Sequence, residues 1–396
     1  MELDLKRPDH VIPDYSLTGD LLSYSRCHLQ YRYYNGSALP PSRPVQLWYG
    51  EFIHGMLEGA FRLWAENPAA AAFPWPYTPL AENGPREPPP AGLARNDIRA
   101  IGWPIEQALA QEGKQARSRR ARLAAYRRAE RAVNMLGPHL FPLISMAEQR
   151  VLGTRPLLPH DPGVAPRAAR YALRGVIDVL GDLDLGAPVG NVFRDAIRAA
   201  CPGLEGEFEI IVDYKGAHRP RTHDDAHWRL GEWQVQTYAW LRERQANAKP
   251  AAAGILIYIN ELAPSSADVG RIQHEVNNNL TDVRPLEGSA DDYQLQAWTP
   301  GAHAQLSDEF RLRRALRLIP VTTDSKAAAT TAFDQLVSEI ESNVLREATL
   351  GHIGQAWAPT CRDPKTCVAC DFLAFCPRPA DGADPDGAPN DDDEDA

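Results

Sequence analysis

The sequence lacks an apolar run long enough to cross a bilayer, because its longest one covers only residues 251–259. It also lacks a secretory leader, since residues 1–6 alternate apolar and charged side chains without an apolar core. No internal repeat is visible, which excludes the repeat architectures. We therefore expect a soluble, cytoplasmic protein with no membrane partner, whose six cysteines are thiols or metal ligands rather than disulfides.

Basic side chains are outnumbered by acidic ones, and the formal net charge of the 396 residues is −10 at pH 7. Taken alone, this balance argues against a nucleic-acid partner. However, residues 381–396 contain eight acidic side chains and no basic one, so the rest of the chain carries a net charge of −2. We predict a disordered acidic tail over residues 381–396 and a nearly neutral body that is compatible with a local basic groove.

Hydrophobic periodicity predicts strands and helices in alternation, which is typical of an α/β domain. The apolar, β-branched runs that read as strands cover residues 143–152, 170–180, 208–212 and 252–260. Helical spacing covers residues 16–35, a segment that begins near residue 45, and residues 228–245 and 324–350. Residues 67–97 are dense in proline and read as a long surface insertion. Residues 261–320 show only weak periodicity.

A strongly basic helix is predicted over residues 104–136. Its cationic side chains go all around the helix and are Lys114, Arg117, Arg119, Arg120, Arg122, Arg127, Arg128 and Arg131. A solvated helix is the favoured interpretation, and a phosphate-binding surface is the alternative.

The strand that ends in Asp213, Tyr214 and Lys215 carries the clearest chemical signal. Side chains alternate along a strand, so Asp213 and Lys215 share one face and Tyr214 lies on the other. A carboxylate that holds a divalent cation, beside a lysine that orients a water, suits metal-assisted hydrolysis of a phosphodiester. Taken alone, a strand with a surface Asp and Lys is the favoured interpretation, because this spacing is common by chance.

A second carboxylate, Asp178, closes another strand 35 residues before Asp213. Consecutive strands usually lie next to each other, so we expect Asp178 and Asp213 to converge on one site. Two carboxylates, the backbone carbonyl of Tyr214 and waters suit Mg²⁺ or Mn²⁺. An added imidazole from His54 favours Mn²⁺, because nitrogen is a softer ligand than oxygen.

Four cysteines lie close together in the sequence just before the acidic tail. The cysteines of this region are Cys361, Cys367, Cys370 and Cys376, and the last three have the spacing C-x2-C-x5-C. Cys27 lies near the other end of the chain. Three clustered cysteines and one more suit either zinc or an iron–sulfur cluster, and spacing alone does not separate the two. Cys201 stands by itself and is expected to be a structural or free thiol.

Together these motifs resemble the PD-(D/E)xK nuclease superfamily. Within it they look most like the iron–sulfur nucleases of the RecB and AddB type and the exonucleases associated with CRISPR adaptation. The ordered motifs are Cys27 to Tyr34, Gly50-x3-His54, the strand glutamate Glu148, Gly175-x2-Asp178, Asp213-x-Lys215, Gln234-x3-Tyr238 and Cys367-x2-Cys370-x5-Cys376. The chain departs from the family pattern at His28, where proline is usual, and in the spare Cys361.

The resemblance implies a restriction-endonuclease-like core over residues 1–380, with a central mixed β-sheet flanked by helices and with insertions near 67–135 and 262–320. His54, Asp178, Asp213 and the carbonyl of Tyr214 would hold Mg²⁺ or Mn²⁺. Lys215 would orient the attacking water, while Gln234 and Tyr238 would contact the substrate strand and brace the site. A 4Fe–4S cluster on Cys27, Cys367, Cys370 and Cys376 would close the fold as a staple over residues 361–376, with Cys361 as an alternative to Cys27.

The implied function is a metal-dependent DNA nuclease, an exonuclease on single strands or duplex ends, in repair, recombination, CRISPR adaptation or antiviral defence. A helicase or a defence-complex protein would be its protein partner. Two alternatives stand beside this hypothesis. The first is a non-catalytic subunit that uses the nuclease fold to bind nucleic acid or protein. The second is a zinc-stabilised interaction protein in which Asp213 and Lys215 are incidental.

Overall fold

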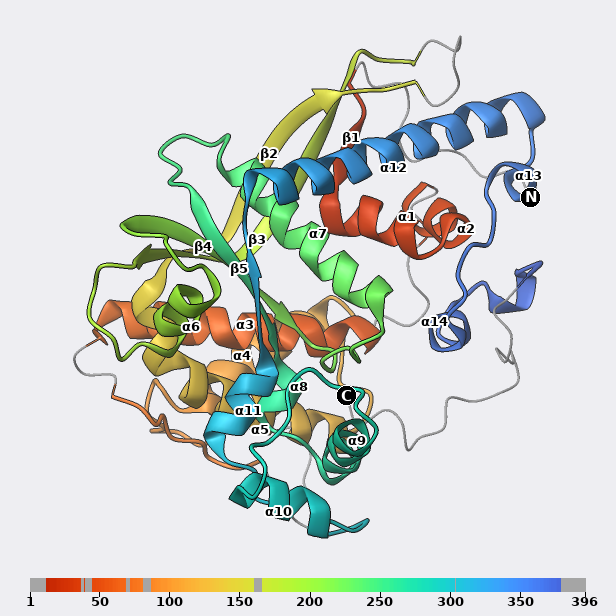
Figure 1. Ribbon diagram of the computed structural model, residues 1–396. Helices are drawn as coiled ribbons and strands as arrows, with labels where there is room; N and C mark the ends of the chain where they lie inside the picture. The colour runs from red at the N-terminus through yellow and green to blue at the C-terminus, as the bar shows by residue number, and fades with distance from the viewer. Residues whose placement is uncertain are drawn as a thin grey trace.

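The computed structural model describes residues 12–36, 39, 45–68, 72–80, 87–159, 166–302 and 304–378. The predicted acidic tail, residues 381–396, lies outside the described residues. The described part of the chain contains a six-stranded mixed sheet with helices on both of its faces (Figure 1). The predicted α/β architecture with a mixed, helix-flanked sheet is therefore confirmed.

The sheet has the strand order β1-β3-β4-β5-β6, and β2 pairs with β3 outside this path. The strands are β1 (Asp14–Ser16), β2 (Ile144–Pro156), β3 (Arg170–Asp184), β4 (Glu207–Lys215), β5 (Ala251–Tyr258) and β6 (Leu316–Pro320). β2, β3 and β4 pair antiparallel, whereas β4 and β5 pair parallel and are joined by α7 (Asp225–Arg242). Every residue of β5 is buried, as expected for a strand that is covered on both faces.

The helices divide between the two faces of the sheet (Figure 1). α3 (Val45–Glu66), α4 (Ile98–Gln111) and α5 (Arg119–Leu140) cover one face, where their side chains share a core with Val212 of β4. α7 and α12 (Thr323–Leu350) cover the other face and share a core with Ile211. Neighbouring residues of β4 thus point into opposite cores, as strand alternation requires.

The remaining short elements are η4 (Phe141–Leu143), α6 (Val192–Ala200), α8 (Ile259–Leu262), α13 (Ile353–Ala356), α14 (Pro364–Val368) and η5 (Leu373–Phe375). None of the helices in the described segments is long and apolar enough to span a membrane.

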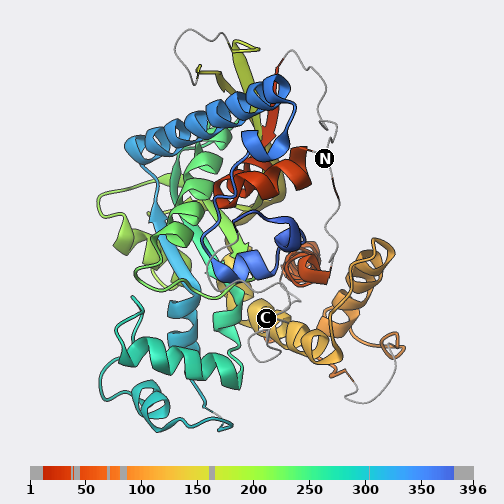
Figure 2. The ribbon, with the colours of Figure 1, turned by 90° about the vertical axis from the view of Figure 1, so that its right-hand side faces the viewer.

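The prediction of one helix over residues 16–35 is wrong in detail. The segment consists of η1 (Leu17–Leu22), α1 (Ser23–Arg26), α2 (His28–Tyr31) and η2 (Arg32–Gly36), with an extended break at Cys27. The amide of Leu29 donates to the carbonyl of Ala358 (3.1 Å), and the amide of His28 donates to Oγ1 of Thr360 (3.1 Å). Tertiary hydrogen bonds therefore replace helical ones at the break, and Figure 2 shows the two ends of the described chain side by side.

The predicted basic helix over residues 104–136 is also wrong, because it is divided into α4 and α5. Gly113 has a φ of 79° in the turn between them, a conformation that favours glycine. Arg122 is buried and donates to both carboxylate oxygens of Glu106 (2.6 and 2.8 Å). Arg128 is likewise buried beside Asp268 (3.2 Å). These two cations bind acids inside the protein, which explains why basic residues go all around the helix.

Two regions whose sequences show little hydrophobic periodicity nevertheless contain buried apolar side chains. In the proline-rich region, Trp75 and Leu80 are buried against α3 and α5, so it is not only a surface insertion. The 262–320 region forms α9 (Ser266–Asn277), α10 (Ala290–Ala297) and α11 (Asp308–Ala315) around their own small apolar cluster. Its attachment to the main domain is partly apolar, through Leu262 and Ala315, and partly ionic, since the buried Arg314 donates to Glu261 (2.8 Å) and Arg128 of α5 lies 3.2 Å from Asp268.

An ion pair joins the N-terminal segment to α12. The fully buried Arg32 donates to both carboxylate oxygens of Glu347 (2.7 and 2.6 Å), which also accepts from Nε1 of Trp357 (2.6 Å). Burial acts to raise the pKa of Glu347, but the hydrogen bonds from Arg32 and Trp357 outweigh it and leave this pKa below its usual value.

We predict that Arg32→Met lowers the free energy of unfolding by about 3 kcal/mol at neutral pH, because it leaves the Glu347 carboxylate without its cationic partner. A carboxyl group with a lowered folded-state pKa stabilises above its unfolded pKa and loses this effect as the pH falls. The deficit should therefore shrink below about pH 4. Urea unfolding measures it, and Arg346→Met on the exposed side of α12 is the control. An equal deficit at both pH values would contradict this assignment.

Candidate active site

Three carboxylates lie in one row across β2, β3 and β4. In the register of β2 with β3, Glu148 stands opposite Asp178. Asp178 and Asp213 each adjoin the last paired residues of β3 and β4, which are Val179 and Val212. The row therefore falls where β3 and β4 stop pairing, so that side chains rather than backbone bonds meet there.

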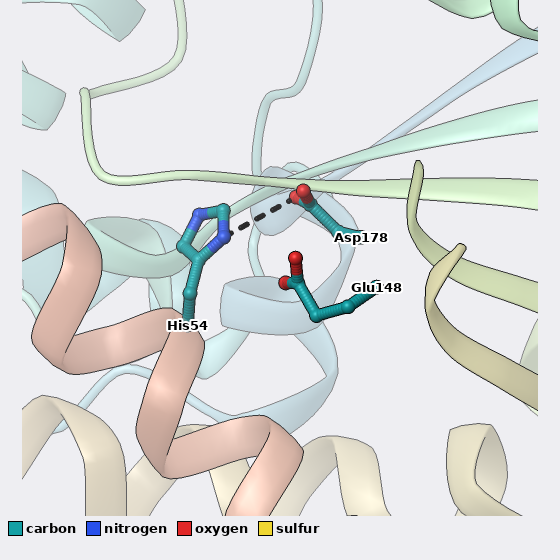
Figure 3. A group of neighbouring side chains, drawn as sticks. All are labelled: His54, Glu148 and Asp178. Carbon is teal, nitrogen blue, oxygen red and sulfur yellow. Dashed lines mark ion pairs between the residues drawn. The ribbon is translucent and has the colours of Figure 1, made fainter. Parts of the chain in front are cut away.

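His54 of α3 completes the close group (Figure 3). One ligand atom each from His54, Glu148 and Asp178 lie within 4.8 Å of one another. Glu148 reaches this position from a left-handed backbone conformation with a φ of 53°, which is uncommon for a residue other than glycine. Such strain at a site of gathered polar groups is typical of functional positions.

The orientation of His54 leaves two acceptors facing each other. Nε2 lies 3.1 Å from the carbonyl oxygen of Tyr214, which can only accept, so Nε2 carries the proton in the neutral ring. Nδ1 then presents a lone pair to Oδ2 of Asp178, 3.5 Å away. In the metal-free protein a proton held between Nδ1 and Oδ2 relieves this arrangement, and a divalent cation can take its place, because imidazole nitrogen and carboxylate oxygen are ligands that Mn²⁺ and related ions accept.

The electrostatics of Asp178 indicate the same need for positive charge. Burial, followed by the neighbouring charge of Asp213, raises the pKa of Asp178 well above its usual value. Two influences oppose this effect, the hydrogen bond that Oδ2 accepts from the amide of Tyr214 (2.9 Å) and the charge of Lys215. Burial and the charge of Glu58 also raise the pKa of Glu148. The group thus has the donor set and the charge deficit of a divalent-cation site.

On the opposite face of β4, Asp213, Lys215 and Gln234 form a closed triangle. Nε2 of Gln234 donates to Oδ1 of Asp213 (2.6 Å), and Nζ of Lys215 donates to Oε1 of Gln234 (2.6 Å). Nζ of Lys215 also lies 2.6 Å from Oδ2 of Asp213. The shared partner on α7 confirms that Asp213 and Lys215 point to one face, while Tyr214 packs with the core on the α3 side.

Tyr238 lies one turn along α7 from Gln234, and its ring lies against Gly175 of β3. A β-carbon on Gly175 would approach this ring to 2.5 Å, so only glycine allows the contact. Tyr238 is buried, and burial together with Asp213 and Asp178 raises its pKa above the usual value. This packing gives a physical reason for the glycine that precedes Asp178 by three residues.

The structure thus brings together all the residues that the sequence indicated for this site. The residues are grouped differently from the prediction. The close group around His54 contains Glu148 where Asp213 was expected, and Asp213 instead binds Lys215 and Gln234. The carbonyl of Tyr214, predicted as a ligand, orients the His54 ring. Glu148 received no role from the sequence, because its position opposite Asp178 depends on a strand register that side-chain patterns do not encode.

The cysteines form a second site at the contact between the two ends of the described chain. One pocket is lined by Gln30 and by Cys27, Cys361, Cys367, Cys370 and Cys376. Cys201 lies elsewhere, with its thiol directed to the carbonyl of Ala252. Five cysteines around one pocket supply thiolates for either a zinc ion or an iron–sulfur cluster.

Comparison with known proteins adds a family match. Residues 205–377 match the PD-(D/E)XK nuclease superfamily, a segment that includes Asp213, Lys215 and the last three cysteines. A solved structure titled "Crystal structure of SSO0001" is 12% identical and covers 81% of this chain and 95% of its own, with a TM-score of 0.26. That score is too low to support a conclusion. No curated protein matches the chain.

We predict that Asp178→Asn raises the melting temperature of the metal-free protein by at least about 2 °C at pH 8. The raised pKa means that the charged carboxylate destabilises the fold above that pKa, so the gain should vanish near pH 4. Asparagine keeps an acceptor for the Tyr214 amide. Differential scanning calorimetry in a chelator measures the gain, and the exposed Asp184→Asn is the control.

Added Mn²⁺ should then stabilise the wild-type protein and the control, but not the Asp178→Asn variant. Equal stabilisation of all three proteins by Mn²⁺ would refute the site.

Proposed function

We propose that this chain, whose residues 205–377 match the PD-(D/E)XK nuclease superfamily, is a metal-dependent nuclease that cuts DNA. The match confirms the resemblance at the level of the superfamily. The single observation that supports the activity is the carboxylate row across three strands, with His54 on one side and the Lys215–Gln234 pair on the other. These are the kinds of side chain that metal-assisted hydrolysis of a phosphodiester requires.

His54, Glu148 and Asp178 would hold Mg²⁺ or Mn²⁺, with Asp213 at the edge of the same site. When bound, the ion polarises the scissile phosphate and lowers the pKa of the attacking water. The donor set fits because the half-buried Asp178 carboxylate, whose pKa is raised, lies 3.5 Å from Nδ1 of His54, and both are ligands that such ions accept.

Lys215 is the residue that would orient the attacking water and offset the negative charge that develops on the phosphate. Gln234 and Asp213 fix its ammonium group from two sides, so little reorganisation is needed at the moment of reaction. Gln234 in turn holds Asp213 through its amide. Tyr238 and Gly175 brace this face by close packing.

A 4Fe–4S cluster in the cysteine pocket is the second part of the proposal. Its support is the convergence of five cysteines from both ends of the described chain on one pocket. Exonucleolytic action on single-stranded or end-containing DNA rests on the resemblance to RecB- and AddB-type nucleases. The same holds for a setting in repair, recombination or antiviral defence beside a helicase or defence-complex protein.

We expect Asp213→Asn, Lys215→Met and Glu148→Gln each to reduce cleavage by at least about 100-fold, because each removes charge at the reacting phosphate. The assay follows end-labelled single- and double-stranded DNA in Mn²⁺, with Asp184→Asn as the matched carboxylate control. Retained affinity for DNA would show that the variants are folded. Wild-type cleavage by Lys215→Met would remove the proposed chemistry, and an inactive wild-type protein that binds DNA would favour the non-catalytic alternative.

Protein purified anaerobically should be brown, with broad absorbance near ~400 nm and about four irons per chain. Zinc is colourless because its d shell is filled. A colourless preparation that contains one zinc would contradict the cluster and would leave the cleavage chemistry untouched.

A further inference from the structure

The cysteine pocket contains one more thiol than a cubane cluster needs. Five cysteines line it, whereas a 4Fe–4S cluster takes four thiolates. Three of them, in the C-x2-C-x5-C spacing, belong to the turn of α14 and η5. The fourth ligand is then either Cys27 or Cys361, and both are buried to the same extent, with 8% exposure.

The same two hydrogen bonds hold both Cys27 and Cys361 beside the pocket. The hydrogen bonds from Leu29 to Ala358 and from His28 to Thr360 align the residues after Cys27 with the residues before Cys361. Neither cysteine can therefore reach the pocket without bringing the other close to it. Because these bonds do not involve sulfur, the alignment does not depend on a bound cluster.

Cys361 differs from Cys27 in having a local acceptor. Its thiol donates to the carbonyl of Asp363 (3.6 Å), which also accepts from the amide of Cys367 (3.1 Å). The carboxylate of Asp363 caps the following turn by accepting from the amide of Thr366 (2.8 Å). This turn therefore gives the Cys361 sulfur a hydrogen-bond partner beside the pocket that is independent of a cluster.

The two ligand sets have different mechanical consequences. A cluster held by Cys27 links positions that are 340 residues apart in sequence, counted to Cys367, and so closes the fold. A cluster held by Cys361 spans only residues 361–376 and leaves the N-terminal segment unlinked. The loop-closure entropy that the cluster removes from the unfolded chain is much larger in the first case.

With Cys27 as the fourth ligand that the resemblance implies, we propose that Cys361 is a reserve ligand that can replace it in the cluster. In the exchange, Cys361 gives up its thiol proton as it binds, and Cys27 takes up a proton as it leaves. One thiolate replaces another, so the charge and oxidation state of the cluster stay the same. The exchange removes the link that the cluster makes between the N-terminal segment and the C-terminal turn, without loss of the cofactor. This inference rests on the proposed cluster and not on the proposed cleavage.

The test compares Cys27→Ser, Cys361→Ser and the double variant, with Cys201→Ser as the control outside the pocket. Iron and acid-labile sulfide are measured after anaerobic reconstitution, together with absorbance near ~400 nm. We expect about four irons per chain in the wild-type protein, the control and both single variants. The double variant should lose at least half of the iron and its absorbance. Circular dichroism establishes that each variant is folded.

Melting temperatures with and without the cluster then identify the preferred ligand. Cluster loss should destabilise the wild-type protein and Cys361→Ser strongly, and Cys27→Ser only weakly, because only Cys27 links the chain ends. An iron-free Cys27→Ser beside a loaded Cys361→Ser would overturn the reserve role. Weak destabilisation of Cys361→Ser would reverse the order of the two ligands. An iron-free wild-type protein would remove the cluster and this inference together, while Mn²⁺-dependent cleavage would still test the nuclease separately.

Discussion

The central constraint on the candidate site is that negatively charged carboxylates lie close together at the point where β3 and β4 stop pairing. Asp178 lies beside Asp213 and opposite Glu148; Asp213 is buried, Asp178 is half-buried and Glu148 is exposed. The fold offers only partial compensation, because Lys215 and Gln234 bind Asp213 and leave Asp178 and Glu148 facing the His54 lone pair. Charge repulsion in a low-dielectric site is costly for stability, and a divalent cation is the group that relieves it.

Helices from both faces of the sheet hold this charge in place. α3 presents His54 from one face, and α7 presents Gln234 and Tyr238 from the other. The N-terminal segment is closed against the C-terminal turn by backbone hydrogen bonds and by the Arg32–Glu347 pair. The cysteine pocket forms at this closure, so a cofactor bound there would act on a contact that the protein already makes.

Strong periodic segments were predictable from the sequence, and long-range partners were not. The strand that ends in Lys215, the helix α7 and the helix α12 follow from their apolar patterns, and alternation placed Asp213 and Lys215 on one face. The break at Cys27 was not predictable, because its hydrogen bonds go to residues more than 300 positions away. The buried Arg122 and Arg128 resemble solvated cations until their acidic partners are known. The place of Glu148 in the site required the register of β2 with β3, which no local pattern contains.

The most direct test of the central claim is the position of a bound cation. Crystals soaked in Mn²⁺ and measured at the manganese absorption edge reveal the ion by its anomalous scattering. The account predicts a peak in contact with His54, Glu148 and Asp178. Loaded crystals that show no peak there, or a peak only at another group of side chains, would contradict it.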